Sequence, residues 1–326
     1  MSLWNHWLNA VEELRPACTR TRTFLWMLLA DGIKAPKEGR RMPGVKMLHQ
    51  QSASNTKPEY IMGHSLQAIS LLVHSAPGQV AGVPLTSRIH EGLVFSNRDA
   101  STLLDKLVAL LMRIAGCLKR PVLLVADAYY ASGKVITPLL DQGHHLISRA
   151  KSNAVAYLPV PAIKRLAKGR PRVYGEKVRL KDLAKDDSAF TGAPSPVYGE
   201  NNVTLRYRVL DLEWRAVGRM VRFVIVHHPQ RGTIFLLCTD LTLEPLQILT
   251  LYGYRFKIEL GFSTGCTCPG CLCLSLLDGR HEAHPARRRR SIPASHLKRL
   301  SCWRAPQAAG LSRACCCYAD PHKISG

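Results

Sequence analysis

Residues 121–127 read PVLLVAD, in which a proline opens a run of five apolar residues and a carboxylate, Asp127, follows it. A continuous apolar run of this length, bounded by such signals, is typical of a strand that is buried on both faces. Residues 24–31, FLWMLLAD, repeat the pattern and deliver Asp31. The two stretches predict neighbouring buried strands with Asp31 and Asp127 both at strand ends.

The segments around these strands predict a mixed α/β layer. The turn signal Ala76-Pro77-Gly78 separates two apolar segments, which indicates an antiparallel hairpin that continues the first strand. Leucines and valines recur at helical spacing after Asn97 or Ser101, either of which can cap that helix. The expected elements are the strand Phe24–Ala30, the hairpin Tyr60–Val73 and Gln79–Ile89, the helix Thr102–Leu118, the strand Val122–Ala126, the helix Ser132–Leu140 and the strand His145–Arg149.

After Asn153 the sequence changes to basic loops and alternating strand patterns, which predict a β-rich insertion. A last helix is expected from Glu244 or Pro245 to about Phe262. The insertion strands are expected at Val203–Val209, Arg219–Val226 and Thr233–Cys238. The predicted divisions are an N-terminal helix and linker (1–23), the first part of the core (24–152), the β-rich insertion (153–240), the last helix of the core (241–262) and a Cys- and Arg-rich tail (263–326), which we expect to be disordered.

Charge identifies the expected partner. Lys and Arg outnumber Asp and Glu by 45 to 23, which gives a formal net charge of +22, and a polyanion such as nucleic acid suits this charge. The longest apolar run, Phe24–Ala30, is far shorter than the roughly 20 residues that cross a bilayer, and the N-terminus lacks export features. We therefore expect a cytoplasmic, nucleoid-associated protein with no membrane partner.

Three carboxylates form the candidate catalytic set. Asp31 and Asp127 follow apolar strands, and Glu259 lies on the last helix, where Tyr252, Arg255 and Glu259 are spaced to share one face. A two-metal phosphoryl-transfer site needs hard oxygen ligands around ions about 3.5 to 4 Å apart. The sequence therefore predicts that Asp31, Asp127 and Glu259 bind two ions, Mg²⁺ or Mn²⁺.

Five stretches of the chain resemble the DDE transposases of bacterial insertion sequences. They are residues 30–34 (ADGIK), 63–65 (GHS), 88–92 (RIHEG), 126–132 (ADAYYAS) and 251–259 (LYGYRFKIE). The resemblance implies an RNase H-like core, a β-rich insertion between the second Asp and the Glu, and a helix with a Tyr, Arg, Glu, Lys signature. It implies DNA transposition by metal-dependent cleavage at the transposon ends, followed by strand transfer into target DNA.

Carried over by position, the resemblance makes Asp31, Asp127 and Glu259 the catalytic metal ligands. It makes Tyr252 and Arg255 contacts to transposon-end DNA, where an aromatic ring and a planar cation suit phosphate. Lys257 and Lys34 complete the predicted DNA-binding residues. Because transposition pairs two DNA ends, we expect an active homodimer.

The sequence departs from the family pattern at both ends of the match. Ser263 and Cys266 stand near the position where the signature Lys is expected, and the first Lys after Lys257 is Lys298. About thirty residues precede Asp31, and Cys- and Arg-rich sequence follows Phe262. We interpret the start as an internal deletion and the tail as out-of-frame translation, so we expect transposition to be impaired or absent.

Two other functions stay open at this point. The tail spacing Cys268-Pro269-Gly270-Cys271, with His281 and His284 downstream, allows a non-enzymatic zinc and nucleic-acid-binding protein. The same three carboxylates also allow an RNase H-like nuclease that cuts DNA without specificity for transposon ends.

Overall fold

The computed structural model describes residues 26–37, 44–49, 58–76, 79–90, 101–160, 172–197 and 200–259. The chain divides into two compact units, Met1–Gly279 and Arg280–Gly326, and every described residue belongs to the first. The predicted N-terminal helix (1–23) and tail (263–326) lie outside the described residues. Within the described ranges, no helix combines the length and the apolar character needed to cross a membrane.

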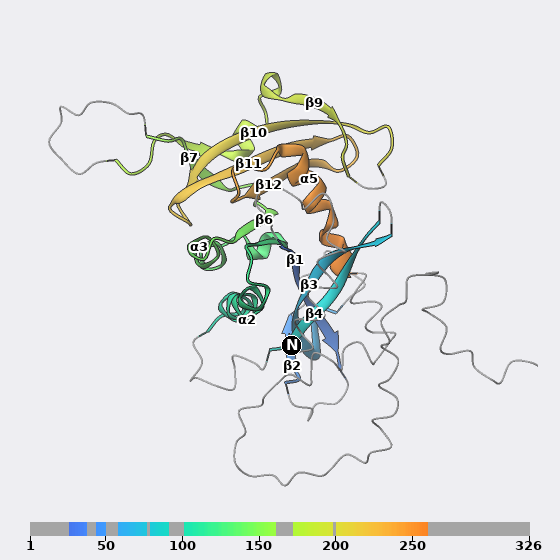
Figure 1. Ribbon diagram of the computed structural model, residues 1–326. Coiled ribbons are helices and arrows are strands. Elements are labelled where there is room, and N and C mark those ends of the chain that lie inside the picture. Colours follow the sequence, from blue (N-terminus) through green and yellow to red (C-terminus); the bar gives the residue numbers. More distant parts are fainter. Residues whose placement is uncertain are drawn as a thin grey trace, which may run out of the picture. The chain divides into compact units, whose positions relative to one another are not determined.

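The described strands form one mixed sheet of twelve strands (Figure 1). Along the sheet the order is β2-β3-β1-β5-β6-β12-β11-β10-β7-β8, while β4 also pairs with β3 and β9 with β10. The strands are β1 (Trp26–Pro36), β2 (Lys46–His49), β3 (Tyr60–Ala76), β4 (Gln79–Ile89), β5 (Val122–Ala126), β6 (His145–Arg149), β7 (Val155–Tyr157), β8 (Lys177–Arg179), β9 (Thr191–Pro194), β10 (Thr204–Trp214), β11 (Arg219–His228) and β12 (Gly232–Cys238).

Helices cover both faces of the sheet centre, where β1, β5 and β6 run parallel. Side chains of α2 (Leu103–Leu118) and α3 (Gly133–Asp141) pack on one face with Leu28 and Leu124 of the strands. Side chains of α5 (Pro245–Gly253) pack on the other face with Leu29 and Val125. Figure 1 shows these helices on opposite sides of β1. Burial on both faces explains the continuous apolar sequence of β1 and β5 and confirms the predicted α/β class.

The β-rich segment extends the core sheet. Its strand β12 pairs antiparallel with β6, and β11 and β10 follow in turn. The predicted strand Val203–Val209 is too short, because β10 continues to Trp214 in unbroken pairing with β11. Small 3₁₀ and α turns occupy Asp187–Ala189 and Leu180–Leu183 between the strands.

Three sequence expectations need correction. Thr102, rather than Asn97 or Ser101, caps α2, because its side chain and that of Asp105 form a reciprocal capping box. Asp31 lies inside β1 instead of at its end, since pairing with β3 continues to Pro36 after pairing with β5 has stopped. The last helix is interrupted, because α5 ends at Gly253 and a 3₁₀ turn, η4 (Tyr254–Phe256), precedes further helical residues 257–259.

Phe223 on β11 provides a test of the packing, because it is among the largest side chains with almost no exposed surface. We expect Phe223→Ala to lower the free energy of unfolding by about 3–5 kcal/mol through lost burial and a cavity. The matched control is Phe256→Ala, whose ring is 55% exposed, and we expect it to cost less than about 1 kcal/mol. Urea unfolding followed by circular dichroism measures both, and equal losses would contradict the described core.

Candidate active site

Parallel pairing of β1 with β5 brings two acidic residues together. Ala30 pairs with Ala126, so Asp31 and Asp127 are the next residues on adjacent strands, which lie roughly 4.8 Å apart. Side chains alternate along a strand, and Leu29 and Val125 face α5. Asp31 and Asp127 therefore belong to the same side-chain rows as Leu29 and Val125, on the face of the sheet that α5 covers.

The helical segment after α5 brings the third acidic residue. The Arg255 guanidinium donates from Nη1 to Oδ2 of Asp31 at 3.2 Å and from Nη2 to Oε1 of Glu259 at 3.0 Å. Ile258, which precedes Glu259 and is 1% exposed, anchors this segment in the core. The segment also approaches β4 closely, because a Cβ atom on Gly82 would lie 3.1 Å from the Lys257 carbonyl oxygen.

Burial and charge act in opposite directions on Asp31. Burial raises the pKa of its carboxyl, whereas the Gly32 backbone N–H, which donates at 2.7 Å, and the Arg255 guanidinium lower it. The negative charges of Glu259 and Asp127 raise the pKa further, and the net effect is a raised pKa. All three carboxylates are therefore close enough to influence one another.

Tyr252 and Arg255 belong to the same cluster. Burial raises the pKa of Tyr252 to about 12, while the positive charges of Arg255 and Arg149 lower it and Asp127 raises it. Burial lowers the pKa of Arg255, but Tyr252 and the three carboxylates outweigh this effect and raise it. The guanidinium also stacks on the Phe256 ring, with 4.6 Å between Cζ and the ring centroid. The guanidinium of Arg255 is therefore positively charged, and the surrounding carboxylates stabilise that charge.

The two predicted DNA-binding lysines have different surroundings. Lys34 belongs to the opposite side-chain row of β1 from Asp31, and its Nζ donates to the His49 carbonyl oxygen on β2 at 2.5 Å. The structure therefore does not bring Lys34 to the carboxylates. Lys257 lies between Arg255 and Glu259 in sequence, and its side chain is partly buried.

Two residues that support the site were not predicted from the sequence. The Ser148 hydroxyl, on β6, donates to the Asp127 carbonyl oxygen at 2.9 Å and fixes the backbone where β5 ends. Tyr130 is 3% exposed, and a Cβ atom on Gly32 would lie 3.4 Å from its hydroxyl, so this hydroxyl lies close to the β1 backbone directly after Asp31. A serine inside the apolar stretch 145–150 was the available signal for Ser148.

The donor chemistry of the cluster suits a divalent metal ion, because carboxylate oxygens are the hard ligands that Mg²⁺ and Mn²⁺ prefer. Among the described residues, however, no three His, Cys, Asp or Glu side chains are arranged so that they could hold an ion together. The guanidinium of Arg255 engages an oxygen of Asp31 and an oxygen of Glu259. The residue types fit a metal site, and Arg255 occupies part of their coordination capacity.

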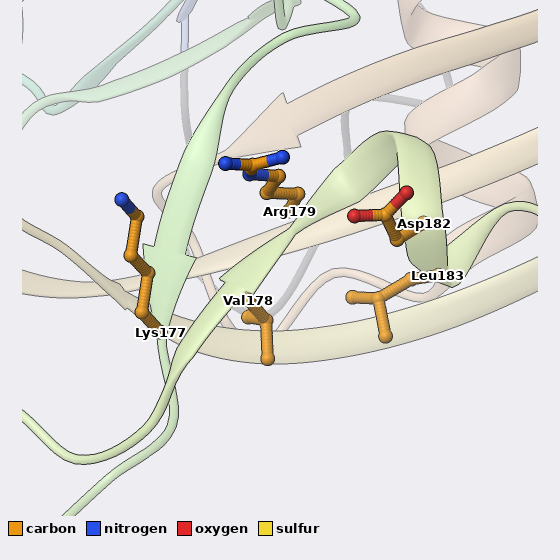
Figure 2. A pocket seen from close by; sticks show the side chains of 5 residues that line it. All are labelled: Lys177, Val178, Arg179, Asp182 and Leu183. Carbon is orange, nitrogen blue, oxygen red and sulfur yellow. The ribbon is translucent and has the colours of Figure 1, made fainter.

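A cavity of about 380 Å³ lies elsewhere, along β8 and the turn that follows it (Figure 2). Its lining residues are Lys177, Val178, Arg179, Asp182 and Leu183. Figure 2 shows the charged ends of Lys177, Arg179 and Asp182 on one side of the strand and Val178 and Leu183 on the other. None of these residues is a predicted site residue, so the cavity contributes nothing to the carboxylate cluster.

The family model for the transposase DDE domain matches residues 79–268, which is more than half of the chain. The chain belongs to the transposase DDE domain family. The match includes Asp127 and Glu259 but begins after Asp31, so the inclusion of Asp31 rests on the β1–β5 register and the Arg255 contact. No curated protein matches the sequence.

Membership agrees with the predicted RNase H-like fold, since the structure is a large mixed sheet with few helices. A transposase DDE domain implies a metal-dependent nucleic-acid enzyme that binds DNA as its substrate.

Ionisation of Asp31 should make the protein less stable. Burial holds the folded pKa of Asp31 above its ordinary value of 3.8, so the ionised form is disfavoured in the folded state, and stability falls as pH rises from 3.8 through the folded pKa. We expect Asp31→Asn to raise the free energy of unfolding at pH 7 in EDTA, although it removes the Arg255 contact. The gain should shrink as pH falls toward 4. Urea unfolding across this range measures it, and a destabilised variant at pH 7 would contradict the argument.

Proposed function

We propose that this protein cleaves DNA at the ends of an insertion sequence and joins those ends to target DNA, with Asp31, Asp127 and Glu259 as the catalytic metal ligands, and that its transposition is impaired because Ser263 and Cys266 stand near the position of the signature Lys. One observation carries the proposal: an arginine joins two acidic residues that are 228 positions apart in sequence, beside a third on the neighbouring strand. Membership of the transposase DDE domain family supports the choice of DNA as the substrate.

Two divalent ions, Mg²⁺ or Mn²⁺, would be held by these three side chains. When bound, they supply activation of the attacking water or 3′ hydroxyl and stabilisation of the leaving oxygen. Asp31 and Asp127 are suited to holding them because adjacent strands fix their backbones. Glu259 is suited because the buried Ile258 fixes the segment that carries it.

The remaining residues of the cluster would bind and orient the DNA. Arg255 presents a planar cation that can form paired hydrogen bonds with a phosphate, and Tyr252 lies beside it. The Tyr252 hydroxyl stays protonated at neutral pH, since its pKa is raised to about 12, so it can donate to a phosphate oxygen. Lys34, Lys257 and the net charge of +22 would strengthen backbone binding without sequence selectivity.

The pairing of two DNA ends calls for two copies of the active site. We therefore propose that the active form is a homodimer assembled on DNA.

The proposal predicts that Asp127→Asn lowers metal-dependent DNA cleavage by at least about a hundredfold, because one ligand of the ions is lost. The matched control is Asp141→Asn, since Asp141 is also an aspartate but ends α3 and forms an exposed ion pair with Arg219. Cleavage by the control should be unchanged. The assay follows nicking of a supercoiled plasmid that carries the insertion-sequence ends, with Mg²⁺ or Mn²⁺.

A second plasmid without these ends separates the two enzymatic functions. Cleavage confined to the end-bearing plasmid supports transposition, whereas equal cleavage of both plasmids supports a nuclease without end specificity. Full cleavage by Asp127→Asn would contradict both.

A further inference from the structure

The strongest unexplained feature of the cluster is the position of Arg255. Its side chain is 13% exposed, and its two terminal nitrogens bind different carboxylates, one on β1 and one on its own helical segment. We propose that Arg255 is an exchangeable internal counter-ion, which competes with divalent cations for Asp31 and Glu259 and must leave them before metal binds. The inference rests on the proposed function, since it concerns the same metal site.

Electrostatics explains why a cation is needed there. Asp31, Asp127 and Glu259 repel one another, and Asp31 is partly removed from water, where repulsion is stronger than at an exposed site. The Arg255 charge opposes this repulsion from a position between two of the three groups. Without Arg255 or a metal, the carboxylates would have to separate or take up protons.

The hydrogen bonding of Arg255 explains why it can be displaced. Each carboxylate accepts one hydrogen bond from it, so neither contact is the paired arrangement that makes arginine–carboxylate bonds strong. Its Nε is buried and has no hydrogen-bond partner in the part of the chain that the structure describes. A buried donor without a partner costs free energy, which departure of the side chain would recover. The exposed Phe256 ring, on which the guanidinium stacks, is a contact that does not depend on the carboxylates.

Arginine and metal cannot use the same oxygens at once. A divalent ion requires most of its oxygen ligands at short distance, and a guanidinium placed between two of them would repel it. Arg255 should therefore weaken metal binding until it finds another anion, such as a DNA phosphate.

The test measures Mn²⁺ binding to the full chain without DNA, from the electron paramagnetic resonance signal of free Mn²⁺. We expect Arg255→Gln to bind Mn²⁺ about tenfold more tightly than the unaltered protein, because a charge-assisted contact no longer competes. Arg219→Gln is the matched control, since it removes the same charge from an exposed ion pair, and its affinity should be unchanged. Asp127→Asn should bind Mn²⁺ more weakly, which assigns the signal to this site.

A second readout separates competition from a structural role. In EDTA, Arg255→Gln should melt at a lower temperature than the unaltered protein, and added Mn²⁺ should raise its melting temperature by more. If circular dichroism shows that this variant does not fold, Arg255→Lys replaces it, because an ammonium keeps the charge but is too compact to bridge both carboxylates. Its Mn²⁺ affinity should also exceed that of the unaltered protein.

The outcomes distinguish this inference from the function on which it rests. Equal or weaker Mn²⁺ binding by Arg255→Gln, with binding still weakened in Asp127→Asn, overturns the competition and leaves the metal site standing. Absence of Mn²⁺ binding in every variant, or binding that Asp127→Asn does not change, overturns the proposed metal site and the competition together.

Discussion

Mutual repulsion among three carboxylates is the constraint around which the described structure is arranged. The parallel pairing of β1 with β5 fixes Asp31 next to Asp127, and the segment after α5 adds Glu259. Such a cluster persists only if a cation offsets it, and Arg255 supplies that charge. Burial raises the pKa of Asp31, and the charges of Glu259 and Asp127 raise it further, so the folded protein holds this carboxylate in its ionised form at a cost in free energy.

The apolar strands make this costly cluster possible. Side chains on one face of β1 and β5 pack against α2 and α3, and those on the other face pack against α5. These two core layers fix the strands that carry Asp31 and precede Asp127. Ser148 and the close approach of Gly82 to Lys257 fix the backbones that carry Asp127 and Glu259. A rigid scaffold of this kind keeps the three side chains in place at some expense of stability, as functional sites commonly do. The transposase DDE domain match places this arrangement in a family of metal-dependent enzymes that act on DNA.

Local sequence was sufficient where local physics decides the structure. Apolar runs and turn signals predicted β1, the β3–β4 hairpin, β5, α2, α3 and β6, because burial and periodicity act over a few residues. The extension of β1 past Asp31 was missed, since it depends on pairing with β3. The same extension places Lys34 inside β1, in the side-chain row opposite to Asp31, where it contacts β2 instead of the carboxylates. The contact of Arg255 with Asp31 spans 224 positions, and no spacing rule predicts it. The roles of the three carboxylates and the domain boundaries remain predictions.

The central claim is that Asp31, Asp127 and Glu259 share one metal site, and anomalous diffraction from Mn²⁺-soaked crystals tests it most directly. The account predicts anomalous density within about 2.0–2.6 Å of carboxylate oxygens from all three residues, with the Arg255 guanidinium moved away from Asp31 and Glu259. Density bound by other residues, or none at these carboxylates at saturating Mn²⁺, would contradict it.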